Sequence, residues 1–263
     1  MSNPEPTIRV NVDVTNPGQF FACCGLLELA DRLWDEAEGW FVGREFCIAV
    51  NGTLPDLIRA VSTAELVQLD PDDDTSSPIR IDKPFRTLRL DWWQDDRAGG
   101  KELKVWAGSM ESYGIARAMQ HAMRCDSFLS PGLLDVGMIV RDPDDNEKKK
   151  EPYYFDARRA PNAHSRDVGF SPNALQMTTT AFPAVELLCL VGLQRCLPAK
   201  TDHPRVFEYF TWAKPVPPTL LPPVVAGAVT LPGSYGYRFE NWYRTGQKKH
   251  KAFRSAIPLS NEG

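Results

Sequence analysis

The stretch from Ile8 to Trp34 constrains the fold more than any other part of the sequence. Isoleucine or valine occupies residues 8, 10, 12 and 14 and alternates with mostly polar residues, the pattern of a half-buried strand. Asn16 then suits a helix N-cap, Pro17 suits the first helical position, and Gln19 is expected to complete a capping box. The sequence therefore predicts a strand, a tight turn and a helix that begins near residue 16.

This helix is predicted to be amphipathic. Apolar residues recur at intervals of three and four from Phe20 to Trp34, whereas Glu28, Asp31 and Asp35 fall on the opposite side. Residues 40–50, rich in aromatic and β-branched side chains, predict a second strand, and residues 54–61 predict a short helix. The chain is therefore predicted to begin in the order β-α-β-α, and its β-α-β opening suits an RRM-like or ferredoxin-like unit.

Later segments predict further strands and helices. Residues 79–81 and 87–92 should form a hairpin around Asp82–Pro84, and residues 205–212 and 234–243 should be strands. Helices are expected at residues 110–125, capped by Ser109, and at residues 183–196. The proline-rich residues 215–225 cannot form a central strand and are expected to wrap an edge or a surface.

These elements predict an α+β fold with a mixed or antiparallel sheet and three main amphipathic helices. Its 263 residues, 43% of them hydrophobic, are enough for one large domain. The charge changes from acidic to basic along residues 141–152. This segment contains no core residue and is expected to form a mobile loop. At this loop the chain could also divide into residues 1–140 and 153–263.

The sequence predicts a cytoplasmic protein with reduced cysteines. The apolar run Val185–Leu193 is interrupted by Glu186 and is far shorter than the roughly 20 residues that span a bilayer. The amino terminus has neither a basic stretch nor an apolar segment of a secretory signal. Five of the six cysteines lie in apolar segments, which favours small core residues over a disulfide framework.

The net charge of −4 conceals an uneven distribution. Residues 1–100 contain 9 Lys and Arg against 18 Asp and Glu, residues 101–200 contain 13 against 12, and residues 201–263 contain 8 against 4. Basic character is thus concentrated toward the carboxyl end. An acidic chain of this kind does not favour a free-standing nucleic-acid binder, but it permits a local basic surface within an assembly.

Residues 241–254 contain no acidic residue and interleave aromatic side chains with cations, a pattern that favours contact with nucleic-acid phosphates. The alternative is an ordinary basic tail. The cations proposed for this contact are Arg244, Lys248, Lys249, Lys251 and Arg254. His250 lies among them.

Two other segments are candidate phosphate contacts. Residues 155–170 contain Arg158, Arg159 and Arg166, which could grip phosphates, although salt bridges to Asp156 and Asp167 are an equal alternative. The run Lys148, Lys149 and Lys150 could touch a phosphate chain or form a solvated charge run.

Some tryptophan side chains could stack on bases. Trp92, Trp93 and Trp242 are the candidates, and the alternative for the first two is that their indoles anchor a long loop onto the core.

Standard signatures of catalysis, of metal binding and of nucleotide cofactors do not occur in the sequence. Three close aspartates in residues 70–78 lack the ligand spacing of a calcium loop, and Cys189, Cys196 and His203 are too far apart for a compact zinc site. We therefore predict no catalytic residue, no metal and no cofactor. The minor alternative is a metal-independent ribonuclease in which His164, beside Arg166, acts as the base.

Several short motifs, in this order, resemble the Csb family of subtype I-U (also called I-G) CRISPR-Cas systems, most closely its third-named group. The motifs are Val12–Trp34, Leu90–Trp93 (LDWW), Lys104–Gly108 (KVWAG), Phe155–Arg159 (FDARR), Asp167–Ser171 (DVGFS), Ala184–Pro198 (AVELLCLVGLQRCLP) and Phe207–Val216 (FEYFTWAKPV). The likeness extends from about residue 8 to residue 245, and the first motif is also similar to the amino ends of Cascade large subunits.

The resemblance implies a non-catalytic subunit of an RNA-guided effector complex, with guide RNA, target DNA and other effector subunits as partners. A large-subunit-like role, at the end where the target-flanking motif is recognised, is preferred. A guide-RNA-binding or repeat-RNA-processing subunit and a structural adaptor are the alternatives. The chain is more acidic than expected for a channel-lining subunit, and shorter than expected for a large subunit.

Overall fold

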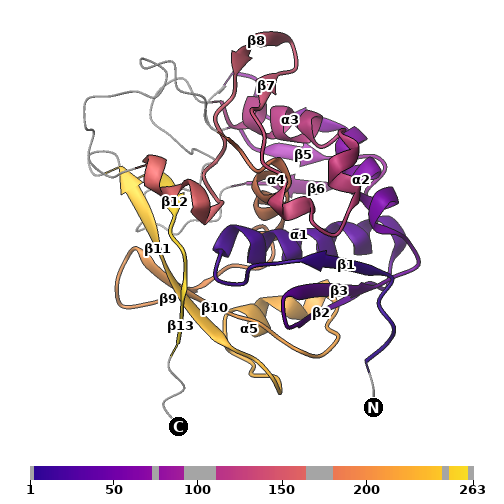
Figure 1. The fold of residues 1–263 in the computed structure, drawn as a ribbon, viewed down its shortest axis with the longest axis vertical. Helices are drawn as coiled ribbons and strands as arrows, with labels where there is room; N and C mark the ends of the chain where they lie inside the picture. The colour runs from indigo at the N-terminus through magenta and orange to yellow at the C-terminus, as the bar shows by residue number, and fades with distance from the viewer. Residues whose placement is uncertain (1–2, 73–76, 92–110, 164–179, 245–248, 260–263) are drawn as a thin grey trace.

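The computed structural model describes residues 3–72, 77–91, 111–163, 180–244 and 249–259, and within them the chain has an α+β fold (Figure 1). Helices and strands alternate along most of the chain, and every strand pairing is antiparallel. The amino-terminal elements are β1 (Ile8–Asn11), α1 (Pro17–Trp34), β2 (Glu38–Val42), β3 (Glu45–Ala49), α2 (Leu54–Thr63), β4 (Leu66–Gln68), β5 (Ile79–Ile81) and β6 (Leu88–Leu90). The later elements are α3 (Ser112–Ala122), η2 (Asp126–Leu129), η3 (Leu133–Asp135), β7 (Arg141–Asp142), β8 (Asp145–Lys149), η4 (Ala157–Ala163), α4 (Pro183–Gly192), β9 (Ala199–Lys200), β10 (Val206–Phe210), η5 (Pro218–Leu220), α5 (Leu221–Val225), β11 (Gly236–Arg244), β12 (Lys249–Phe253) and β13 (Ile257–Pro258).

The first sheet has the order β1-β3-β2. The single strand predicted for residues 40–50 is wrong: Gly43 adopts a φ of +59°, which glycine tolerates, and turns the chain into the β2–β3 hairpin. The order β-α-β-β-α matches the first five elements of a ferredoxin-like unit. In the described chain, however, β4 pairs with β5 and not with β1, so the specific RRM-like sheet is not confirmed.

Helix α1 begins as the sequence predicts, with Asn16 as its N-cap accepting a hydrogen bond from the Gly18 N–H (3.1 Å). The expected capping box is wrong, since the Gln19 Oε1 atom accepts from the Asp13 N–H instead (2.7 Å). The expected solvent face is also wrong in part. All residues from Pro17 to Ala30 are buried, including Glu28, because α1 is covered on several sides.

Helix α1 lies between the first sheet and the group formed by α2, α3, α4, β5 and β6 (Figure 1). Its contact with α4 brings the two backbones together at a pair of glycines. A Cβ atom at Gly25 would collide with the Leu188 carbonyl, and one at Gly192 would collide with the Phe21 carbonyl. This close approach makes α1 and α4 the centre of a core whose residues run from Ile8 to Ala256, on both sides of residues 141–152.

Several predicted elements are confirmed around this centre. Strands β5 and β6 form the expected hairpin, and α4 and β10 lie within their predicted ranges. Helix α3 begins at Ser112 after Glu111, while its expected cap, Ser109, lies outside the described residues. Residues 141–152 are not an irregular loop, because β7 and β8 pair as a hairpin that projects beyond α3 (Figure 1).

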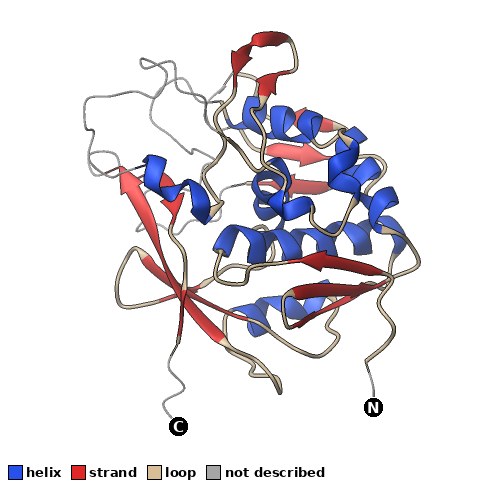
Figure 2. Ribbon diagram, viewed as in Figure 1, coloured by secondary structure: helices blue, strands red, loops and turns tan. Residues whose placement is uncertain are grey.

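The carboxyl-terminal sheet has the order β12-β11-β10-β9, and β13 also pairs with β11. The predicted strand at residues 234–243 is therefore confirmed as β11, and the described residues of the basic run 241–254 are not a free tail, because most of them lie in β11 and β12, which pair with each other. The proline-rich segment does cover an edge, since Val216 pairs with Gly39 of β2; it then forms the unexpected helix α5. Figure 2 shows that the strands of this sheet cross the molecule beside the helices.

The six cysteines are free thiols, and all except Cys125 are buried. None of the helices among the described residues combines the length and the apolar character needed to cross a membrane.

Candidate nucleic-acid interface

The segment 155–159 is held on the ends of α1 and α4 through its backbone N–H groups. The N–H groups of Phe155 and Asp156 donate to the Glu186 carboxylate of α4, each at 3.1 Å. The Ala157 N–H donates to Asn16 Oδ1 (3.0 Å), and the Arg158 N–H donates to Asp156 Oδ1 (2.9 Å). Side-chain oxygens thus bind four successive amides in a buried region, where unpaired amides would be costly.

The start of α1 explains why Asn16 and Gly18 occupy their positions. Asn16 caps the helix, donates from Nδ2 to Asp156 Oδ1 (3.0 Å) and receives the Ala157 N–H. A Cβ atom at Gly18 would collide with the Phe155 carbonyl oxygen, so only glycine lets the segment lie this close. Three of the motifs that carry the family resemblance, around Asn16, Asp156 and Glu186, therefore meet in space.

Arg158 is engaged within the protein. Its Nε and Nη2 atoms donate to the two oxygens of Asp156 (2.9 and 2.7 Å), and Nη2 also donates to the Leu134 carbonyl (2.7 Å). Its Nη1 atom donates to Asp135 (2.8 Å), and the guanidinium lies 3.5 Å from the centroid of the Phe182 ring. Asp156 already binds the edge of the guanidinium that could form two parallel hydrogen bonds with a phosphate. Of the two alternatives for Arg158, a salt bridge therefore fits better than a phosphate contact.

The carboxylates of this cluster are deeply buried. Burial, followed by the charge of Asp156, raises the pKa of Glu186 to about 8. Burial opposes the charged form of Arg158, but its hydrogen bonds with Asp156 and Asp135 outweigh this effect and raise its pKa. Arg159 is only 8% exposed, and its guanidinium lies 6.0 Å from the centroid of the Tyr154 ring. One feature of the sequence could have indicated this cluster: Glu186 is the single charged residue within an apolar helix.

The second basic segment packs directly on the first. The Phe253 N–H of β12 donates to the Tyr154 carbonyl (3.1 Å), and Ala252 packs with Tyr154 and Ala160. His250 is fully buried, with Nε2 2.8 Å from the Tyr153 carbonyl and Nδ1 2.8 Å from Asn241 Oδ1. Burial lowers the pKa of His250 to about 3, so this ring is a neutral core group rather than a cation for phosphate.

The β11–β12 hairpin carries Trp242 and Arg254 beside each other. The Arg254 guanidinium lies 4.9 Å from the centroid of the Trp242 ring, and Arg254 also pairs with Glu240 (2.9 Å). Arg244, Lys249 and Lys251 lie in strands β11 and β12 of the same hairpin. The predicted residues Lys248, Arg166, His164, Trp92 and Trp93 lie outside the described residues.

The three lysines of the β7–β8 hairpin differ from one another. Lys150 is anchored by Asp142 (3.2 Å) and Glu111 (3.7 Å), and its side chain is 14% exposed. Lys148 and Lys149 are exposed on β8, and neither has an ion-pair partner among the described residues. Arg117 of α3 and Asp144 form a bidentate ion pair (2.5 and 2.7 Å) that fixes the hairpin to α3. Lys148 and Lys149 therefore lie on a hairpin that is held in place.

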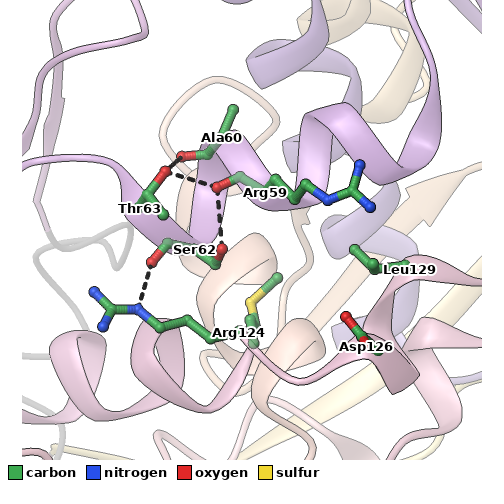
Figure 3. A pocket seen from close by; sticks show the side chains of 8 residues that line it. Arg59, Ala60, Ser62, Thr63, Arg124, Asp126 and Leu129 are labelled. Atoms are coloured by element: carbon green, nitrogen blue, oxygen red, sulfur yellow. Dashed lines mark hydrogen bonds between the residues drawn. The ribbon is translucent and has the colours of Figure 1, made fainter.

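A cavity of about 470 Å³ lies elsewhere, between α2, the end of α3 and η2 (Figure 3). The hydroxyl groups that line it donate hydrogen bonds to the backbone. Ser62 and Thr63 both donate to the Arg59 carbonyl, at 3.0 and 2.8 Å. Arg124 donates to the Ser62 carbonyl (3.3 Å). With its polar groups used in this way, the cavity shows no nucleophile paired with a base. Within the described parts of the chain, no group of three metal-binding side chains is found.

Comparison with known proteins found no family model that matches the chain, no related curated protein and no similar solved structure.

Proposed function

We propose that the chain is a non-catalytic, cytoplasmic subunit of an RNA-guided type I CRISPR effector complex of the Csb kind, and that it binds a nucleic-acid backbone. The observation that carries the proposal is the pair of exposed lysines, Lys148 and Lys149, on the β7–β8 hairpin that the Arg117–Asp144 ion pair fixes to α3. Strands β11 and β12 carry a second set of cations, which are Arg244, Lys249 and Lys251. Further support comes from the meeting of three resemblance motifs around Asn16, Asp156 and Glu186.

Within the complex, we favour a large-subunit-like role at the end where the target-flanking motif is recognised. Its partners would be guide RNA, target DNA and neighbouring effector subunits. The second candidate is a guide-RNA-binding subunit built on an RRM-like unit. It is favoured by the β-α-β-β order in which the strands of the first sheet and helix α1 follow one another along the chain.

The test measures binding of single-stranded and duplex nucleic acids to the purified full chain and to the assembled complex, over a range of salt concentrations. Two variants remove the proposed contacts: Lys148→Glu with Lys149→Glu, and Lys248→Glu, Lys249→Glu and Lys251→Glu together. Each should weaken binding and lower the salt dependence, because every lost phosphate contact reduces the slope by roughly 1.

A matched variant, Lys83→Glu with Lys214→Glu, makes the same change of charge as the double variant at two exposed lysines outside the proposed interface. It should reduce affinity less than the double variant does. Equal effects of the two double variants would mean that only the overall charge matters. Unchanged binding by every variant would contradict the proposal and favour a structural adaptor.

A further inference from the structure

A second cavity, of about 410 Å³, adjoins the 155–159 segment. It lies where the end of β1, the β2–β3 turn and η3 meet, and Arg158 forms part of its wall. Every residue that lines it except Val12 is polar, and the residues that matter for its chemistry are Asp13, Gln19, Arg44, Glu45, Asp135 and Arg158. The volume lies within the usual range of ligand sites.

Most charges in this cavity are neutralised in pairs. Glu45 pairs with Arg9 (3.0 Å), and Asp135 pairs with Arg158 (2.8 Å) and also accepts from Gln19 Nε2 (3.2 Å). Asp13 and Arg44 differ, because neither has an ion-pair partner among the described residues. The cavity therefore offers one anion and one cation that remain available to a ligand.

Asp13 is also held in a defined orientation. Its Oδ1 atom accepts from the Thr15 N–H (2.9 Å) and from the Thr15 hydroxyl (2.7 Å), so Oδ2 keeps its lone pairs for another donor. The Arg44 backbone is fixed where its carbonyl accepts from the Val12 N–H (2.9 Å). Because a carboxylate oxygen has more than one lone pair, Oδ2 can accept from two adjacent donors of a ligand, and the Arg44 guanidinium can donate to two adjacent acceptors.

Resting on the proposed function, we infer that this cavity binds one unpaired guanine of the bound strand. Guanine has adjacent N1–H and N2–H donors on one edge, which match Asp13 Oδ2, and the O6 and N7 acceptors, which match Arg44. Adenine, cytosine and uracil each lack this combination of adjacent donors and acceptors. The chain would thus read one base while its lysines hold the backbone.

The experiment compares binding of three short single-stranded RNAs to the full chain: uracil only, uracil with one central guanine, and the same strand with inosine in place of guanine. Inosine lacks the N2 amino group but keeps O6 and N7. The wild-type chain should bind the guanine strand roughly fivefold or more tightly than the other two. Asp13→Asn keeps Oδ1 for Thr15 but replaces Oδ2 by an N–H donor, so the guanine strand should lose its advantage over the inosine strand.

Asp126→Asn makes the same chemical change in the other cavity and should keep the preference for guanine. Arg44→Ala provides an independent test if Asp13→Asn fails to fold, because it removes the donors to O6 and N7 and should reduce the preference for guanine over uracil. Salt-dependent binding with equal affinities for the three strands would overturn the guanine site and leave the proposed function standing. No salt-dependent binding to any strand would overturn both.

Discussion

Two basic parts of the molecule, the 155–159 segment and the β7–β8 hairpin, use their charges in opposite ways. In the first, the Arg158 guanidinium donates to Asp156, Asp135 and the Leu134 carbonyl, and Asp156 is fully buried. In the second, Lys148 and Lys149 are exposed and have no ion-pair partner in the described chain. The difference teaches that a cation's role depends on whether the fold places carboxylates around it, which a local count of charges does not reveal.

The comparison is tested most strongly by Arg158→Ala. This change leaves the Asp156 carboxylate buried without its cation, so we expect the free energy of unfolding to fall by about 3 kcal/mol. Lys149→Ala is the matched control and should change stability by less than about 0.5 kcal/mol. Urea unfolding followed by circular dichroism measures both. Equal stabilities of the two variants would show that the two regions do not differ as argued.

Gly18→Ala tests whether the close approach of the segment to α1 matters. The added methyl group would collide with the Phe155 carbonyl, so the segment must shift and the protein should lose about 2 kcal/mol. Gly132→Ala is a suitable control, because only the Ser130 hydroxyl lies near the added atom, at 3.9 Å. If both variants unfold at the same urea concentration, the packing of residues 155–157 on α1 does not limit stability.

Local patterns predicted the elements of this cluster but not the cluster itself. Asn16 was identified as a cap from its neighbours alone, because a cap depends on residues within one helical turn. Its bonds to Asp156 and Ala157 join residues about 140 positions apart, and no local pattern records such a distance. The sequence predicts a loop at residues 141–152 instead of a hairpin for a related reason. Both strands of that hairpin are polar, so they lack the alternation by which strands are recognised.

Glu186, which binds the 155–159 segment, makes the stability of the folded protein depend on pH. Its pKa is raised to about 8 in the folded protein from an ordinary value of 4.5, so the folded state holds a proton that the unfolded state has released between these values. This contribution is fully present below pH 4.5 and is lost as the pH rises toward 8. The stability of the wild-type chain relative to Glu186→Gln should therefore fall by about 1 kcal/mol or more across that range.

Urea unfolding of both proteins at pH 5, 6.5 and 8 measures this difference, in which the contributions of groups that do not interact with Glu186 cancel. A difference that stays constant with pH would mean that Glu186 is ionised throughout. Its carboxylate would then be held by the Phe155 and Asp156 amides strongly enough to offset its burial.

The smallest effect separates neighbours within the β7–β8 hairpin. Lys150→Ala removes an ion pair with Asp142 from a largely covered position, so it should lower stability by about 0.5 kcal/mol, whereas Lys149→Ala should not. Binding of nucleic acid should show the reverse order, because of these two lysines Lys149 is the one whose charge faces solvent without an ion-pair partner among the described residues. Unfolding and salt-dependent binding measured on the same two variants decide the matter. If Lys150→Ala weakens binding as much as Lys149→Ala, then pairing with Asp142 does not withdraw a lysine from the interface, and Arg158 must be reconsidered as a phosphate contact by the same argument.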